Sequence, residues 1–298
     1  MKAILVSGLL SILLIILMTL NMAGQSVEIT LSVEKNQFQL GEPVVLLVSV
    51  TNRDRTEINV PPELGPESDF LTYVVSDPDG KETAFSPLFV ADYADYKALG
   101  RNETARGTAR IFYGGNGYTF TKPGRYSVIA RYRESRSRPV SFEVLQPRSD
   151  AEREQARIVL DHPEVGLFLM LEGGDELEDA LSQFDKLLRN HPGSVITQYV
   201  RYAMAKNYSV PARNFVSQKP RNADLPRTVE ILRETKIEEM QFYYRTNAVE
   251  TLATALQKLE RRDEARNVLE EFSRNLEQRE NLLPYFMPRI EEKLRELR

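Results

Sequence analysis

The spacing of apolar residues changes once along this chain, near Gln146-Pro147, and this change constrains the fold more than any other feature. Before it, apolar residues occupy alternate positions, as in 27–34 and 126–133. A period of two is typical of a strand with one buried face. After it, apolar residues recur at intervals of three and four, as in 175–188, which is typical of an amphipathic helix. The sequence therefore predicts an all-β region followed by an all-α region.

The β region, which we expect to span 25–146, has the pattern of a two-sheet sandwich. Residues 44–50 are nearly continuously apolar, as in a core strand, and 140–144 supply a last strand. Turn-forming residues separate the apolar runs, at 41–43, 77–80, 114–117 and 123–124. About seven short strands at regular spacing are typical of a sandwich.

The helical region is expected to span 153–298, after a linker at 147–152. Besides 175–188, helical periodicity is present at 242–259, 263–276 and 290–297. Residues 209–226 contain Pro211, Pro220 and Pro226 with little periodicity, and we expect a long loop there.

The N-terminal segment 1–24 has the pattern of a secretory signal peptide. Lys2 precedes an apolar run over 3–20, and Ala23-Gly24 closes it with small residues. The alternative is an uncleaved membrane anchor, because about 18 apolar residues can just span a bilayer. Both interpretations export the rest of the chain, to the periplasm or the extracellular space. An exported chain without cysteine indicates a bacterial envelope rather than a eukaryotic secretory product.

Composition excludes several classes of function. The chain has no cysteine, which excludes disulfides, thiolate metal sites and a cysteine nucleophile. It has two histidines, which leaves little for histidine-based catalysis. The formal net charge of -4 gives no basic excess to hold nucleic acid. No nucleophile elbow, phosphate-binding loop, zinc-protease or dinucleotide motif is present.

Two segments of the β region resemble bacterial immunoglobulin-like modules. Residues 40–52, LGEPVVLLVSVTN, read as a turn, a core strand and an asparagine at its end. Residues 118–128, YTFTKPGRYSV, read as a turn feeding a strand, with Tyr126 where a corner tyrosine bonds back to the backbone. The resemblance implies the sandwich fold over 26–146, but no particular function. Similar sandwiches include a family of bacterial proteinase inhibitors.

The helical region resembles degenerate tetratricopeptide repeats. Ala180, Phe184 and Pro192 have the small, large and proline spacing of that family, and Ala253 and Ala265 begin a second copy. The chain departs from the family pattern at two places. Gly173-Gly174 interrupts the helix before Ala180, and Glu277 stands where the second copy should have its closing proline. The resemblance implies two to three stacked helical pairs.

Three local patterns suggest sites, each with a structural alternative. His162-Pro163 and His191-Pro192 suggest a ligand pair, but a residue before proline is also typical of a corner between helices. Residues 77–82, DPDGKE, resemble a calcium loop, but Lys81 and Glu82 replace its ligand and glycine, and we favour a hairpin turn. For 114–117, GGNG, we favour a hairpin over a phosphate cradle.

Charged and aromatic clusters are ambiguous in the same way. One basic run consists of Arg131, Arg133, Arg136 and Arg138. It could bind an anion, but we favour the exposed face of a strand and its turn. A carboxylate pair, Asp92 and Asp95, is interleaved with Tyr93 and Tyr96. We favour a connecting segment with exposed tyrosines, which are good interface anchors.

These observations predict an exported, non-enzymatic binding or scaffold protein with a protein partner of unknown identity. We assign no catalytic, cofactor-binding or metal-binding residue, expect no nucleic acid, and expect membrane association only if 1–24 remains uncleaved. The candidate contact residues are Tyr199, Tyr202, Tyr243, Tyr244 and Arg245, because aromatic residues and arginine dominate binding hot spots. Their alternative role, which we favour for at least half of them, is packing in the core of the repeats.

Three other functions stay open. The sandwich could be a secreted proteinase inhibitor, which predicts near-stoichiometric inhibition of a protease. The chain could be a hydrolase with dispersed carboxylates, which predicts a deep acidic cleft. Carbohydrate binding through exposed tyrosines is a third possibility, which the absence of tryptophan weakens.

Overall fold

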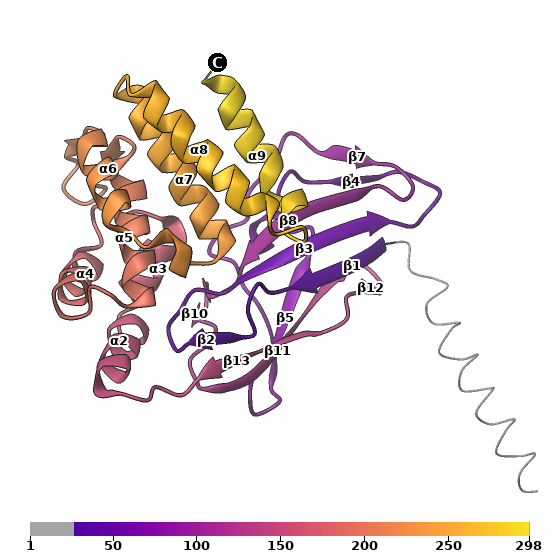
Figure 1. Cartoon of the computed structure of the whole chain (residues 1–298). Helices are drawn as coiled ribbons and strands as arrows, with labels where there is room; N and C mark the ends of the chain where they lie inside the picture. The colour runs from indigo at the N-terminus through magenta and orange to yellow at the C-terminus, as the bar shows by residue number, and fades with distance from the viewer. Residues whose placement is uncertain (1–26, 298) are drawn as a thin grey trace, which may run out of the picture.

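The computed structural model describes residues 27–297, in which a β-rich region is followed by a helical region (Figure 1). The signal peptide predicted at 1–24 lies outside the described residues. The strands of the β region are β1 (Val27–Ser32), β2 (Gln37–Gln39), β3 (Val45–Asn52), β4 (Ile58–Val60), β5 (Thr72–Ser76), β6 (Glu82–Ala84), β7 (Lys97–Leu99), β8 (Thr104–Arg110), β9 (Tyr113–Gly114), β10 (Gly117–Tyr118), β11 (Gly124–Tyr132), β12 (Ser135–Arg136) and β13 (Val140–Leu145). The prediction of a β region before a helical region is confirmed.

Two sheets organise the β region. One has the order β1-β3-β8, and the other has the order β2-β13-β11-β5-β6, with β12 paired to β11. Alternate residues of β1 are buried, as its period of two predicts. Inner-face side chains of the two sheets, such as Ile29, Val48, Val75 and Val128, belong to one hydrophobic core. The edge strands β2 and β6 of the larger sheet have three residues each.

Tyr126 closes a corner at the start of β11. Its hydroxyl donates to the backbone oxygen of Lys122 at 3.1 Å and accepts the Lys122 N–H at 3.2 Å. Its ring is buried between those of Phe120 and Phe142. The bond back to the backbone predicted for this tyrosine is thereby confirmed.

Each helix of the second region packs on the next along the chain. The helices are α2 (Asp150–Leu160), α3 (Pro163–Leu171), α4 (Glu178–Asn190), α5 (Val195–Tyr208), α6 (Leu225–Glu234), α7 (Phe242–Lys258), α8 (Arg262–Glu277) and α9 (Leu283–Glu296), with short 3-10 turns at Pro66–Ser68 and Ile237–Glu239. Ser149 and Ser194 cap α2 and α5, each accepting an N–H bond at 3.1 Å. The helical runs predicted at 175–188, 242–259 and 263–276 are confirmed as α4, α7 and α8, within a few residues.

The long loop predicted at 209–226 is wrong in part. This segment forms a hairpin of β14 (Ala212–Arg213) and β15 (Pro220–Arg221), and α6 begins at its end. Proline is compatible with this hairpin because a two-residue ladder needs few backbone donors, so Pro220 fits at its edge. The Asn214 N–H donates to the Lys219 carbonyl at 3.0 Å and closes the turn.

The helices gather along one side of the β region, where α9 packs on β8 and α3 packs on the β9–β10 hairpin (Figure 1). Leu47 of β3 faces away from the sheet-to-sheet core and packs in a second cluster with α7, α8 and α9. The first core also continues from the sheets into α2–α5, through residues such as Val159 and Phe168.

Buried hydrogen bonds join the two regions. The Gln241 side chain donates to the Pro43 carbonyl at 2.6 Å and accepts the Val45 N–H at 3.1 Å. The Glu34 carboxylate accepts the N–H of Phe242 at 2.8 Å, at the positive end of the α7 dipole. In the described part of the chain, no helix is both long and apolar enough to cross a membrane.

Candidate functional site

A hollow lined by charged side chains lies between the β region and the helices. We call it the seam cleft, and its volume is about 390 Å³. Its walls come from β8, from the segment before and within the first 3-10 turn, and from α7 and α9. The lining residues are Pro62, Glu63, Glu67, Arg106, Gly107, Thr108, Arg110, Tyr243, Asn247, Tyr285, Phe286 and Arg289. Ligand sites favour such junctions because two rigid bodies supply the walls.

Strand β8 supplies one cationic wall. Because side chains alternate along a strand, Arg106, Thr108 and Arg110 share one face, and Ala109 on the other face is buried in the core. Arg106, Thr108 and Arg110 therefore face the helices. Because β8 pairs with β3 over seven residues, the backbone that carries these three side chains is held in place.

Arg110 is held in place by several contacts. Its guanidinium donates to the Met170 carbonyl at 2.8 Å and to the Glu172 carboxylate at 3.2 Å. It also lies 5.5 Å from the centre of the Tyr243 ring, in cation–π geometry. An arginine keeps its charge at any physiological pH. The arrangement therefore fixes a permanent positive charge at the wall of the cleft.

The helices contribute a second fixed arginine. Arg289 of α9 donates to the Asn247 side-chain oxygen at 2.8 Å and pairs with the Glu250 carboxylate on α7. Arg106, by contrast, forms no ion pair with any residue in 27–297. The cleft thus has two oriented guanidinium groups and a third that is exposed and available to a ligand.

The opposite wall is acidic. Burial raises the pKa of Glu67, and the neighbouring carboxyl of Glu63 raises it further. Burial also raises the pKa of Tyr93 to about 12, with Glu63 and Glu67 adding to the effect. The backbone N–H of Ala91 donates to the Glu67 carbonyl at 2.7 Å, so the loop carrying Tyr93 is tied to this wall.

Most of the predicted contact residues are not accessible. Tyr199, Tyr202 and Tyr244 are 1%, 1% and 2% exposed, so their assignment as surface contacts is wrong. Their rings pack edge to face between α5 and α7. Tyr243 lines the seam cleft, and Arg245 is partly buried and lies over the Phe242 ring at 4.6 Å.

Enrichment of aromatic residues in binding hot spots does not distinguish an exposed tyrosine from a buried one whose hydroxyl has a polar partner. The Tyr199 hydroxyl donates to the buried Glu42 carboxylate at 3.0 Å. Lys35 pairs with the same carboxylate at 2.5 Å. The β region therefore supplies the polar partner, which a helix considered alone could not reveal.

The histidines form corners rather than a ligand pair. His162 precedes α3 and His191 follows α4, as the proline pattern predicted. His162 Nδ1 lies 2.8 Å from the Asp179 carboxylate, and His191 Nε2 lies 3.1 Å from the Glu154 carboxylate. Across residues 27–297, no group of three side chains could hold a metal ion.

The other motifs also lie where their structural interpretations place them. Asp77 accepts the N–H groups of Asp79 and Lys81 at 3.0 and 2.9 Å, which makes 77–82 a hairpin turn. Residues 114–117 join β9 to β10. The basic run flanks the β11–β12 hairpin, with Arg131 opposite Arg136. The two tyrosines predicted to be exposed differ in exposure: Tyr93 is partly buried, and Tyr96 is 49% exposed.

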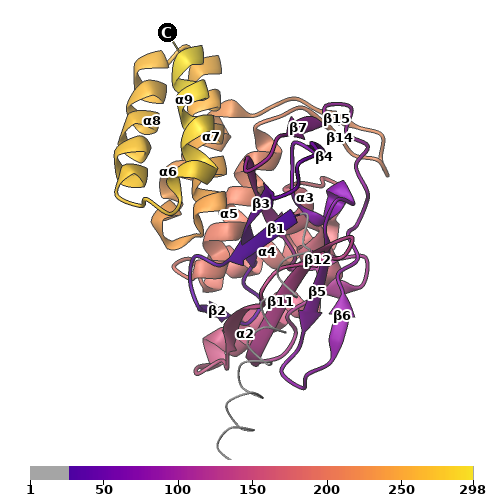
Figure 2. The ribbon, with the colours of Figure 1, turned by 90° about the vertical axis from the view of Figure 1, so that its right-hand side faces the viewer.

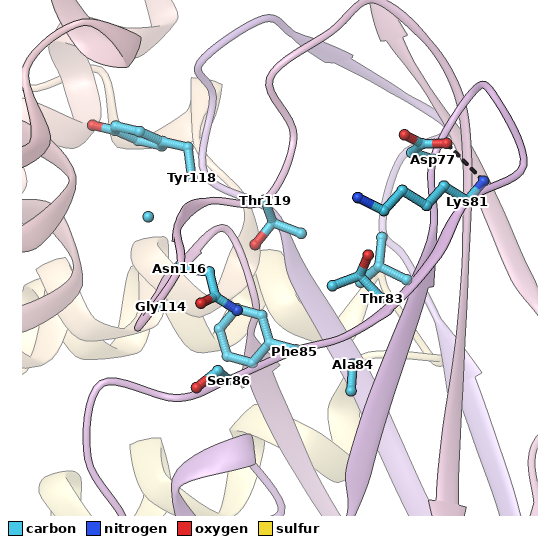
Figure 3. Close-up of a pocket in the computed structure, with 12 residues that line it drawn as sticks. Asp77, Lys81, Thr83, Ala84, Phe85, Ser86, Gly114, Asn116, Tyr118 and Thr119 are labelled. Atoms are coloured by element: carbon cyan, nitrogen blue, oxygen red, sulfur yellow. Dashed lines mark hydrogen bonds between the residues drawn. The ribbon is translucent and has the colours of Figure 1, made fainter.

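A second hollow of about 190 Å³ lies between β6 and the β9–β10 hairpin (Figure 3). Val75, Thr83 and Thr119 are among its lining residues, and Asp77 and Lys81 stand at one end. The Tyr118 ring points away from this space, and its hydroxyl is buried without a partner. This second hollow is smaller than the seam cleft, and Asp77 is the one carboxylate among its lining residues. We therefore treat the seam cleft as the candidate site.

Comparisons with known proteins give no family. No protein-family model matches the chain, and no curated protein matches it. Among solved structures, a Pseudomonas fluorescens alkylpurine DNA glycosylase, AlkC, is 16% identical with a TM-score of 0.30, over 42% of this chain and 32% of that one. A Listeria innocua β-glucosidase is 16% identical with a TM-score of 0.26, over 40% and 16%. A CARDB domain from Pyrococcus furiosus is 15% identical with a TM-score of 0.21, over 40% and 89%.

These likenesses are too slight to carry any argument about function. The chain spans about a third of the glycosylase and about a sixth of the β-glucosidase.

Proposed function

We propose that this chain is an exported, non-enzymatic protein-binding protein of the bacterial cell envelope, which recognises carboxylate groups of a partner protein in the seam cleft. We further propose that its two regions are an immunoglobulin-like sandwich and tetratricopeptide-like helices. The observation that carries the proposal is the convergence of Arg106, Arg110 and Arg289 on one cleft between rigid elements. Arginine forms two parallel hydrogen bonds with a carboxylate, so it suits this ligand.

Preorganisation supports binding at this place. Arg110 and Arg289 are already oriented by their own partners, so a ligand would not need to order them. Tyr243 and Tyr285 add ring surface beside the guanidinium groups. Arginine and tyrosine are the residue types most enriched in binding hot spots.

The test is charge reversal of the unpaired arginine. We expect Arg106→Glu to weaken binding of synthetic aspartate- and glutamate-rich peptides about tenfold or more, because one charge-assisted hydrogen bond contributes about 1.5–3 kcal/mol. Binding would be measured by fluorescence anisotropy, with asparagine- and glutamine-substituted peptides for comparison. Arg136→Glu makes the same change on an exposed hairpin away from the cleft and should have no effect. Equal loss in both variants, or in neither, would reject the seam cleft.

The acidic wall favours a second candidate function, hydrolysis by paired carboxylates. Glu67 has a raised pKa and faces the cleft beside Glu63, as a general acid and its partner would. Glu67→Gln should then abolish turnover of any substrate found by screening while leaving its binding intact. If Glu67→Gln keeps full turnover, this candidate is excluded.

The proteinase-inhibitor alternative is best tested on the whole chain. Gln241 and Glu34 join the β region to the start of α7 through hydrogen bonds, so an isolated 25–146 fragment would lose these bonds and expose Glu34 and the Pro43 carbonyl. Titration of a protease panel with the full chain should show no stoichiometric inhibition. A sharp one-to-one endpoint would replace our proposal with the inhibitor function.

A further inference from the structure

The β14–β15 hairpin exposes apolar side chains at its tip. Phe215 is 74% exposed and Val216 is 83% exposed, the highest values among the large hydrophobic residues in the described chain. The hairpin extends away from the helices, at the upper right of Figure 2. Full burial of a phenylalanine contributes about 1.5–3 kcal/mol, so its exposure here forgoes a large stabilisation.

The base of the hairpin is fixed to the body of the molecule. Asp175, before α4, accepts from Arg221 Nε and Asn207 Nδ2, both at 2.7 Å, through its carboxylate. The backbone carbonyl of Asp175 accepts from Asn214 Nδ2 at 2.9 Å. One residue therefore connects the hairpin to α5 and to the segment before α4.

The turn itself is also ordered by hydrogen bonds. The Asn214 side-chain oxygen accepts the N–H groups of Val216 at 3.0 Å and Ser217 at 2.7 Å. The Gln218 side chain donates to the Phe215 carbonyl at 2.6 Å. These bonds hold the two apolar residues at the outermost point, so their exposure is built into the fold.

The charge around this tip is positive. Residues 209–223 contain Arg213, Lys219 and Arg221 and no acidic residue, in a chain whose formal charge is -4. Arg221 is paired with Asp175, which leaves one cation on each side of the tip. Anionic lipid attracts such residues by about 1 kcal/mol each.

We propose that this hairpin inserts its tip into the interface of an anionic phospholipid bilayer. Phe215 and Val216 would enter the boundary between headgroups and acyl chains, and Arg213 and Lys219 would contact lipid phosphates. A protein partner fits less well, because a stable protein interface buries about 800 Å² on each side and two side chains on a narrow turn supply far less. A lipid surface needs no such area or shape. The inference is independent of the seam cleft.

A second exposed apolar loop provides the matched control. Phe89 is 52% and Val90 is 61% exposed. Their loop, 86–96, contains Asp92 and Asp95 and no lysine or arginine. It offers similar apolar surface with the opposite charge, so an anionic membrane should repel it.

The chain has no tryptophan, so a single introduced one reports on its own surroundings. The experiment uses the full chain carrying Phe215→Trp, with Phe89→Trp as the control. Each would be mixed with vesicles of phosphatidylcholine and phosphatidylglycerol, and with phosphatidylcholine alone. We expect a blue shift and quenching by brominated lipid for Phe215→Trp on anionic vesicles only, reduced by salt. Phe89→Trp should show neither.

Charge reversal separates membrane insertion from general stickiness. In the Phe215→Trp background, Arg213→Glu with Lys219→Glu should abolish the shift and the quenching, while the far-ultraviolet circular dichroism is unchanged. Absence of a shift in Phe215→Trp on every vesicle would overturn the proposal. So would equal quenching in the two tryptophan variants, or quenching that persists after charge reversal.

Discussion

Replacement of Gln241 by alanine should reveal how strongly the two regions depend on each other. This side chain is 2% exposed and bonds two backbone groups of the β region, the Pro43 carbonyl and the Val45 N–H. Alanine cannot replace either bond. Each buried group left without a partner costs about 1–3 kcal/mol, so Gln241→Ala, which leaves two, should lose about 2–6 kcal/mol. That is a large part of the stability of a typical domain, about 5–15 kcal/mol.

The measurement is urea unfolding followed by circular dichroism, in which strand and helix signals can be compared. The control is Gln183→Ala, because Gln183 is 4% exposed but bonds only Asp179 and Lys186 of its own helix. We expect the control to cost about 1 kcal/mol or less. The reasoning fails if Gln241→Ala costs no more than the control. It also fails if the unmodified chain unfolds in two separate steps, because shared buried bonds should make the regions unfold together.

Three further predictions concern single residues. Gly166→Ala should destabilise the fold by about 1–3 kcal/mol in thermal melts, because the added Cβ would lie 2.2 Å from the ring of Tyr113 in β9. The control is Gly193→Ala, which should be neutral because its Cβ would have no atom within 4 Å. Tyr126→Phe should lose about 1 kcal/mol in urea unfolding with the corner bond, and an unchanged midpoint would contradict this. Burial opposes ionisation of Asp175, but bonds from Arg221 and an asparagine outweigh it and lower its pKa below 3.8. Its stabilising effect should be full above that value and disappear as pH falls through the lowered pKa, so Asp175→Asn should flatten the acid limb of stability against pH.

Periodicity identified much of the fold, for a physical reason. An alternating pattern records which face of a strand is buried, and β1 keeps that pattern in the structure. In β11 the expected residues Tyr126, Val128 and Ala130 are buried, but Ile129 on the other face is buried too. The apolar stripe of 175–188 likewise predicted α4, where Ala180 and Phe184 are fully buried. A pattern of this kind is local, so it needs no knowledge of the partner.

The candidate site was missed because its signal is not local. β8 reads Thr-Ala-Arg-Gly-Thr-Ala-Arg, with no large apolar residue on either face, so its arginines did not suggest a strand. Arg289 belongs to the last helix, 183 residues after Arg106, and only the packing of α9 on β8 brings them together. The buried tyrosines show the same limit, since the Glu42 partner of Tyr199 is 157 residues away.

The short outer strands of the larger sheet bear on how this chain behaves at high concentration. A sheet edge is a template on which another copy can pair, and the hazard grows with the number of unpaired backbone groups. β2 and β6 offer three residues each, with glutamines on one and a glutamate on the other. Beyond β6, the Ser86 carbonyl is already occupied by the Gly115 N–H at 2.8 Å, so the edge cannot lengthen. The larger sheet is thereby protected against pairing with another copy at its two edges.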